Sequence, residues 1–197
     1  MACTCVPLSC QTLDDWMGAM NARHFLASLW LSSLAVTAGA ESGAHEHGVA
    51  HLHLVQDGAA LSVEFESPLD SLVGFEHAPR DDAHKQALRI SHEALENAAQ
   101  MVSLPAAAGC AVDTVEVEMP FVEDAHHDHL GKGEHADAQA HYTFNCTEPS
   151  ALTQLTVGLF KAFPRLERID AEAATAAGQG KAVLRPAQAT WTLPAPR

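Results

Sequence analysis

The sequence predicts a single α+β domain: an antiparallel sheet of hairpins, two helices packed on one face, and a disordered histidine-rich loop. Apolar and polar residues alternate on both sides of Asp57-Gly58, which is typical of a β-hairpin. Apolar residues at helical spacing follow Asp81, and a second set follows Ser150. Helices that follow hairpins, without a regular strand–helix–strand alternation, favour a mainly antiparallel sheet.

Residues 1–40 are expected to be a secretory signal peptide. A short basic start at residues 20–24 precedes an apolar run over residues 25–36, and a cleavage motif ends at Ala40. The run is shorter than the ~20 residues that cross a bilayer, so we expect no membrane insertion of the mature chain, residues 41–197. Asp14 and Asp15 do not suit the start of a signal peptide, and a mis-assigned start codon would explain residues 1–19.

The first predicted hairpin joins residues 49–55 to residues 61–66. With Asp57 and Gly58 as a two-residue turn, the pairs are Leu54 with Leu61, Leu52 with Val63, and Ala50 with Phe65. The opposite face then carries His51, His53, Ser62 and Glu64 and should be exposed to water.

The remaining elements follow in order. We expect a loop over residues 68–79 and a helix from Asp81 to about Val102. Two partner strands over residues 112–119 and 141–146 should flank a loop over about residues 122–140. A second helix should follow Ser150 and end at Pro164, and short strands are expected at 166–173, 181–185 and 190–193.

Nine of the 13 histidines lie in two tracts, which favours a metal-binding domain over residues 41–197. The first tract contains His45, His47, His51 and His53, and Glu64 across the hairpin could complete a zinc site. The second contains His126, His127, His129, His135 and His141 among carboxylates. Its loop cannot bury a core, so we expect it to be disordered without a ligand and to collect or buffer metal. The alternatives are a polar surface with no ligand role for the first tract, and a pH sensor for the second.

Two cysteines remain after residue 40, Cys110 and Cys146. An even number in an oxidising compartment favours a disulfide, which would close the base of the long-looped hairpin. The alternative is a pair of thiolate metal ligands.

The net charge of −14 disfavours nucleic acid as a partner and favours divalent cations. No H-E-x-x-H helix is present, so a zinc-dependent hydrolase is a secondary hypothesis and the chain is expected not to be an enzyme. Imidazole and carboxylate ligands suit zinc but also other divalent transition metals. An accessory chaperone for copper or nickel is therefore a further alternative.

Several ordered motifs resemble the ZrgA-type family of small periplasmic zinc-binding proteins. They are His45-Glu46-His47-Gly48, Ser67-Pro68, Gly74-Phe75-Glu76-His77-Ala78-Pro79, Tyr142-x-Phe144-x-Cys146 and Leu159-Phe160-x-x-Phe163-Pro164. The resemblance implies a periplasmic location, zinc binding through the histidine-rich segments, and a role beside a zinc ABC importer or its solute-binding protein. It supplies no residue-level ligand list. Within the third motif, His77 could add a metal ligand, or Phe75 could serve packing alone.

Overall fold

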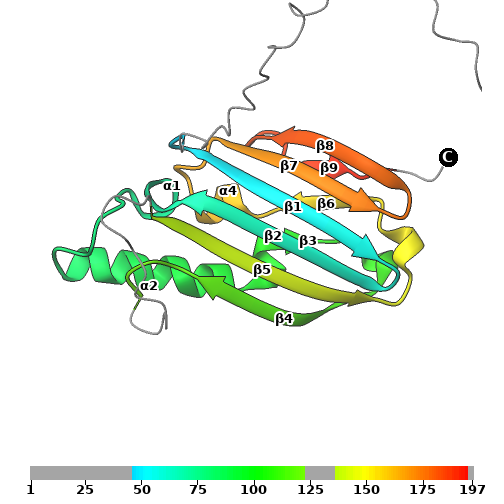
Figure 1. Ribbon diagram of the computed structural model, residues 1–197, viewed down its shortest axis with the longest axis horizontal. Helices are drawn as coiled ribbons and strands as arrows, with labels where there is room; N and C mark the ends of the chain where they lie inside the picture. The colour runs from blue at the N-terminus through cyan, green and yellow to red at the C-terminus, as the bar shows by residue number, and fades with distance from the viewer. Residues whose placement is uncertain (1–45, 123–135, 195–197) are drawn as a thin grey trace, which may run out of the picture. The chain divides into compact units, whose positions relative to one another are not determined.

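The computed structural model describes residues 46–122 and 136–194, and these residues form two β-sheets with helices between the strands. Figure 1 is viewed onto the broad face of the six-stranded sheet, whose order is β4-β5-β2-β1-β7-β8. Its strands are β1 (Val49–Asp57), β2 (Ala60–Pro68), β4 (Cys110–Glu118), β5 (Asp137–Cys146), β7 (Arg168–Thr175) and β8 (Gly178–Leu184). The second sheet, ordered β3-β6-β9, consists of β3 (Val102–Ser103), β6 (Gln154–Val157) and β9 (Thr190–Thr192).

The helices and the small sheet lie behind the six-stranded sheet in Figure 1. None of the described elements covers the face toward the viewer, which we call the open face. The helices are α1 (Leu69–Val73), α2 (Asp82–Glu96), α3 (Ala98–Met101) and α4 (Leu159–Ala162), with 3-10 turns η1 (Ala106–Ala108) and η2 (Pro149–Ala151). Buried residues of both sheets and of α2 belong to one hydrophobic core. The predicted fold class is confirmed as a sheet-rich α+β domain. Among the strand pairs of the described residues, β1 and β7 alone are parallel.

The first hairpin has the predicted faces but a register shifted by two residues. Leu54 pairs with Val63 rather than with Leu61, because Gly58 and Ala59 form the turn in place of Asp57 and Gly58. Gly58 has a φ of +58°, and a glycine with positive φ at the first turn position is what a type II′ hairpin turn needs. A shift of two residues preserves the side-chain alternation, so the predicted open face is unchanged.

Helix α2 begins where the sequence predicts and ends earlier. Asp81 caps it by accepting a hydrogen bond from the backbone N–H of His84 at 2.9 Å, and this bond lowers the pKa of the Asp81 carboxyl. Asn97 interrupts the helix and caps α3 through a bond from the N–H of Gln100 at 3.3 Å. One long predicted helix is therefore two helices. A short unpredicted helix, α1, replaces part of the predicted loop over residues 68–79.

The predicted second helix, from Ser150 to Pro164, is wrong. That segment forms the turn η2, the strand β6 and the single-turn helix α4. The leucine spacing fits a helix, but Leu155 and Val157 also alternate with Thr156, and the structure uses this two-residue period to pair β6 with β3 and β9. A Cβ on Gly158 would lie 1.8 Å from the carbonyl oxygen of Gln100, so this chain crossing requires glycine.

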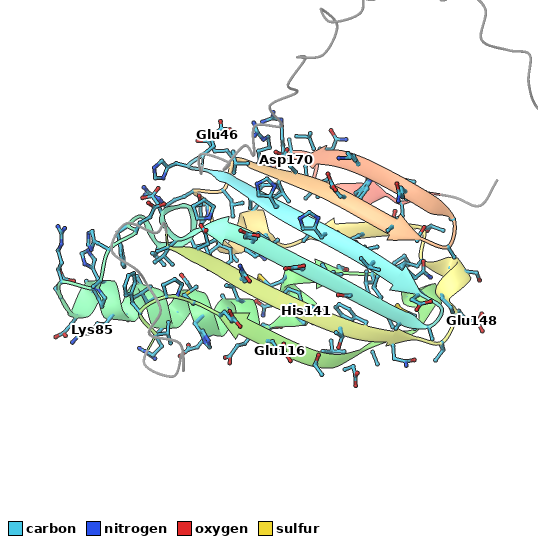
Figure 2. All side chains as sticks on the ribbon, in the orientation of Figure 1. Glu46, Lys85, Glu116, His141, Glu148 and Asp170 are labelled. Carbon is cyan, nitrogen blue, oxygen red and sulfur yellow. A yellow bond between two sulfur atoms is a disulfide. The ribbon has the colours of Figure 1, made fainter. Side chains whose placement is uncertain are left out.

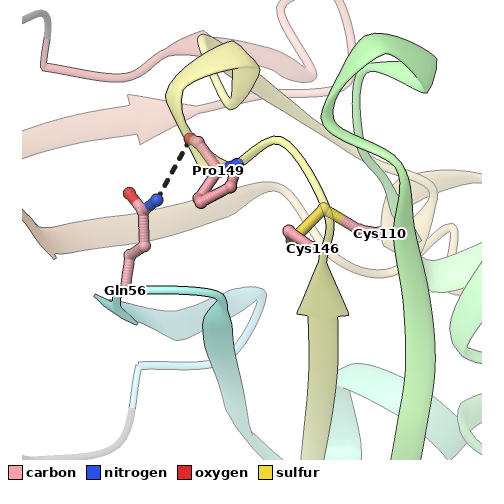
Figure 3. Close-up of a disulfide and its surroundings, with 4 residues drawn as sticks. All are labelled: Gln56, Cys110, Cys146 and Pro149. Atoms are coloured by element: carbon pink, nitrogen blue, oxygen red, sulfur yellow. Dashed lines mark hydrogen bonds between the residues drawn. A yellow bond between two sulfur atoms is a disulfide. The ribbon is translucent and has the colours of Figure 1, made fainter.

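Cys110 at the start of β4 lies opposite Cys146 at the end of β5, and they form the predicted disulfide (Figure 3). The Gln56 side chain donates a hydrogen bond to the Pro149 carbonyl at 3.1 Å, which ties the end of β1 to the segment after β5. Strand β5 begins at Asp137, and Ala138 and Ala140 are fully buried, so the predicted loop over 122–140 extends too far into this strand.

Several sequence predictions lie outside the described residues. These are the signal peptide over residues 1–40 and the candidate ligands His45, His126, His127, His129 and His135. Within residues 46–122 and 136–194, no helix combines the length and apolar composition needed to cross a membrane.

Candidate functional site

The open face of the six-stranded sheet carries a row of ionisable residues, one from each strand. Strand pairing places these residues side by side, and we call them the histidine row: Glu116, His141, Glu64, His53, Glu172 and Lys181. Imidazole and carboxylate alternate along it, so each of its two histidines has a glutamate opposite on both neighbouring strands. Figure 2 shows Glu116 and His141 on adjacent strands of this face.

A second row runs parallel to the first, two residues away from it on each strand. This acidic row consists of Glu118, Gln139, Glu66, His51, Asp170 and Val183. His51 lies between Glu66 on β2 and Asp170 on β7, in the way that His53 lies between Glu64 and Glu172. Because side chains of a strand alternate between faces, His51 and His53 share the open face at a separation of about 7 Å.

The structure thus brings four predicted site residues onto one face: His51, His53, Glu64 and His141. It adds carboxylates that the sequence reasoning missed, namely Glu66, Glu116, Glu118, Asp170 and Glu172. The alternation of Asp170 and Glu172 with buried Ile169, Ala171 and Ala173 was a readable signal for an acidic strand face. Sequence alone could not show that this strand lies beside β1.

Ion pairs and hydrogen bonds already occupy part of this face. Lys181 pairs with Glu172 directly across the β7–β8 pair. The guanidinium of Arg168 lies 3.2 Å from the Asp170 carboxylate and 3.1 Å from that of Glu46. His141 Nε2 lies 2.7 Å from the Ser62 hydroxyl.

The pKa of the Glu172 carboxyl is lowered, chiefly by the hydrogen bond and charge of Lys181 and further by His53 and His51. The Glu172 carboxylate is therefore close enough to both imidazoles of β1 to interact with them electrostatically. A shallow hollow of 380 Å³ lies over strands β1, β7 and β8. Its lining includes His51, His53, Asp170, Glu172 and Lys181. A small cation reaching the hollow meets two imidazoles, two carboxylates and the ammonium group of Lys181.

The open face carries side chains of the types that bind metal ions, but the described residues do not form a preorganised metal site. Among residues 46–122 and 136–194, no group of three or more His, Cys, Asp or Glu side chains converges in a geometry ready for a metal ion. The side chains of Glu172 and Lys181 are 49% and 79% exposed, so they can turn without disturbing the core. The strands fix the Cα spacing, and exposed rotamers would supply the final approach to an ion.

The remaining described residue of the first tract, His47, has contacts in a different place. Its Nδ1 lies 3.0 Å from the Asp70 carboxylate on α1 and 4.0 Å from that of Glu76. The N–H of Gly48 donates to the buried Ser71 hydroxyl at 2.9 Å, which anchors the start of β1 on α1. His47 therefore sits at a corner next to α1 rather than in either row.

The motif around His77 forms an aromatic cluster at the start of α2. Phe75 is buried, and its ring centroid lies 5.3 Å from that of His77 and 4.4 Å from that of His84. His77 Nδ1 donates to the Ala78 carbonyl at 2.9 Å. The packing role predicted for Phe75 is confirmed, and a ligand role for His77 stays a prediction.

Comparison with known proteins gives one informative match. A family model described as ZrgA family zinc uptake protein matches residues 44–193, which include both sheets and all the helices. No curated protein matches the chain.

Proposed function

Because the chain belongs to the ZrgA family of zinc uptake proteins, we propose that it is a periplasmic protein that captures or buffers zinc and assists its uptake. The observation that carries the proposal is the histidine row, in which imidazoles and carboxylates alternate across a rigid sheet. Neutral imidazole and carboxylate are the nitrogen and oxygen ligands that zinc takes in proteins. The net charge of −14 favours the approach of a divalent cation.

We assign the tightest binding to the open face, with His51 and His53 as its nitrogen ligands. They project from a strand held between two others, so little backbone entropy is lost when an ion binds. His141 lies two strands away and would serve a second ion with Glu64 or Glu116. The histidines over 126–135, together with His45, His47 and His77, would act as additional weaker ligands.

The protein would act without catalysing a reaction, since the family is one of zinc uptake proteins rather than enzymes. Zinc is its cargo. We propose a zinc ABC importer or its solute-binding protein as the recipient of the ion.

Zinc titration of residues 41–197 by calorimetry tests the proposal. Changing His51 and His53 together to alanine should remove the tightest binding while the circular dichroism spectrum stays the same. A control that changes His84 and His92 on α2 to alanine removes the same number of imidazoles away from the open face. The proposed site is wrong if the His51/His53 variant keeps the affinity of the unaltered protein, or if both variants lose it equally.

A further inference from the structure

An ion pair between Glu172 and Lys181 lies beside His53, where the parallel strands β1 and β7 are paired. It affects how a bound ion would be held and released. Both strands beside β1 place a carboxylate opposite His53: Glu64 on β2 and Glu172 on β7. The sequence singled out Glu64 alone. The hollow over this face lies toward β7 and β8 and is lined by Glu172.

Glu172 differs from Glu64 in having a cation directly opposite. Lys181 on β8 forms an ion pair with it, and both side chains are well exposed. The hollow is lined by Lys181 as well as by His51 and His53, so the ammonium group and the two imidazoles border the same space. The carboxylate of Glu172 therefore already has a cationic partner.

We propose that Glu172 is the carboxylate ligand of a divalent transition metal held by His53, and that Lys181 competes with the ion for that carboxylate. This inference rests on the proposed function and names the ligand and the competing group of the same site. An ion of charge +2 outweighs a single ammonium, but it must first break the existing pair. The flexible four-carbon stem of lysine keeps the displaced ammonium close by, so it lowers the affinity and assists release.

The size of the competition follows from the charges. Removing one positive charge about 6 Å from a divalent ion in a nearly aqueous environment should tighten binding about three- to tenfold at physiological ionic strength. Removing the carboxylate should weaken binding about tenfold or more, because the ion loses a ligand and the imidazoles lose the neighbouring negative charge.

The experiment follows the ring proton signals of His53 by NMR while zinc alone is added to residues 41–197 at neutral pH. Assignment comes from the signal lost in His53→Gln. This readout reports the sheet site even when other histidines bind zinc. The variants are Lys181→Gln, Glu172→Gln and Glu64→Gln.

Lys161→Gln serves as the charge-matched control, because Lys161 is exposed in α4 behind the sheet. We expect the zinc concentration at half-shift to fall with Lys181→Gln, to rise with Glu172→Gln and to stay unchanged with Lys161→Gln. Equal midpoints for Lys181→Gln and Lys161→Gln would overturn the competition. A weakening by Glu64→Gln without one by Glu172→Gln would overturn the ligand assignment. If the His53 signals of the unaltered protein do not respond to zinc at all, the proposed function fails at this face. If they respond but no variant changes the zinc concentration at half-shift, only this inference fails.

Discussion

The disulfide between Cys110 and Cys146 should supply a large part of the stability of this domain. Its two ends are separated by 36 residues, and a covalent loop of that length removes about 13 cal/mol/K of entropy from the unfolded chain. At 25 °C this corresponds to about 4 kcal/mol. For a protein of this size the expected fall in Tm on breaking the bond is about 8–16 °C.

Urea unfolding of residues 41–197 measures this effect cleanly. Only two of the five cysteines and one of the three tryptophans lie in that range, so Trp191 fluorescence reports a chain with a single cross-link. Trp191 is 7% exposed and pairs within the small sheet, so its emission should change when the core opens. The oxidised protein is compared with the same protein reduced by a phosphine, which keeps both sulfur atoms in place.

The double variant Cys110→Ala/Cys146→Ala separates the cross-link from the packing of its sulfur atoms. Cys146 is buried, so the variant should lose slightly more stability than reduction alone. Both forms should still fold, because β5 remains paired with β2 and β4 along its length. The reasoning is refuted if oxidised and reduced protein unfold at the same urea concentration.

Three further outcomes are expected. Tyr142→Phe should cost about 1–2 kcal/mol in urea unfolding, because the buried hydroxyl donates a hydrogen bond to the Leu95 carbonyl at 2.8 Å and the variant loses that bond. An unchanged midpoint would show the bond to be dispensable. Gly158→Ala should cost about 2–4 kcal/mol, since its Cβ would meet the Gln100 carbonyl, and a normal melting temperature would contradict that crossing. Replacing residues 123–135 by a Gly-Ser segment of equal length should lower the number of zinc ions bound, measured by calorimetry, without changing the urea midpoint; global unfolding would refute the assignment of these residues to a connection.

Local sequence patterns predicted the elements whose signal is itself local. The alternation around Gly58 fixed which residues face water, since a two-residue period survives even the two-residue error in register. Asp81 predicted the start of α2 because a capping side chain acts on the next turn of the same helix. The pairing of Cys110 with Cys146 was predicted because only these two cysteines follow residue 40, and strand pairing places them opposite each other.

The largest errors arose where a distant contact decides the structure. Residues 152–163 carry leucines that suit a helix, but β6 forms because β3 and β9 supply strand partners from elsewhere in the chain. The same dependence hid Glu172, because its place beside His53 exists only through the parallel β1–β7 pair. Nothing in the local sequence of residues 168–175 indicates that neighbour.

The geometry of the open face bears on what kind of metal protein this chain can be. A preorganised site holds an ion tightly because its ligands lose little entropy on binding, whereas the proposed ligands of the histidine row are exposed side chains on paired strands. Glu64 lies between His53 and His141 and can serve either of them, so neighbouring positions along the row share a carboxylate. Shared, incomplete ligand sets favour moderate affinity and exchange between positions over permanent retention. Such a surface suits a protein that must yield its ion to a partner, and the ammonium of Lys181 at one end of the row would add to that tendency.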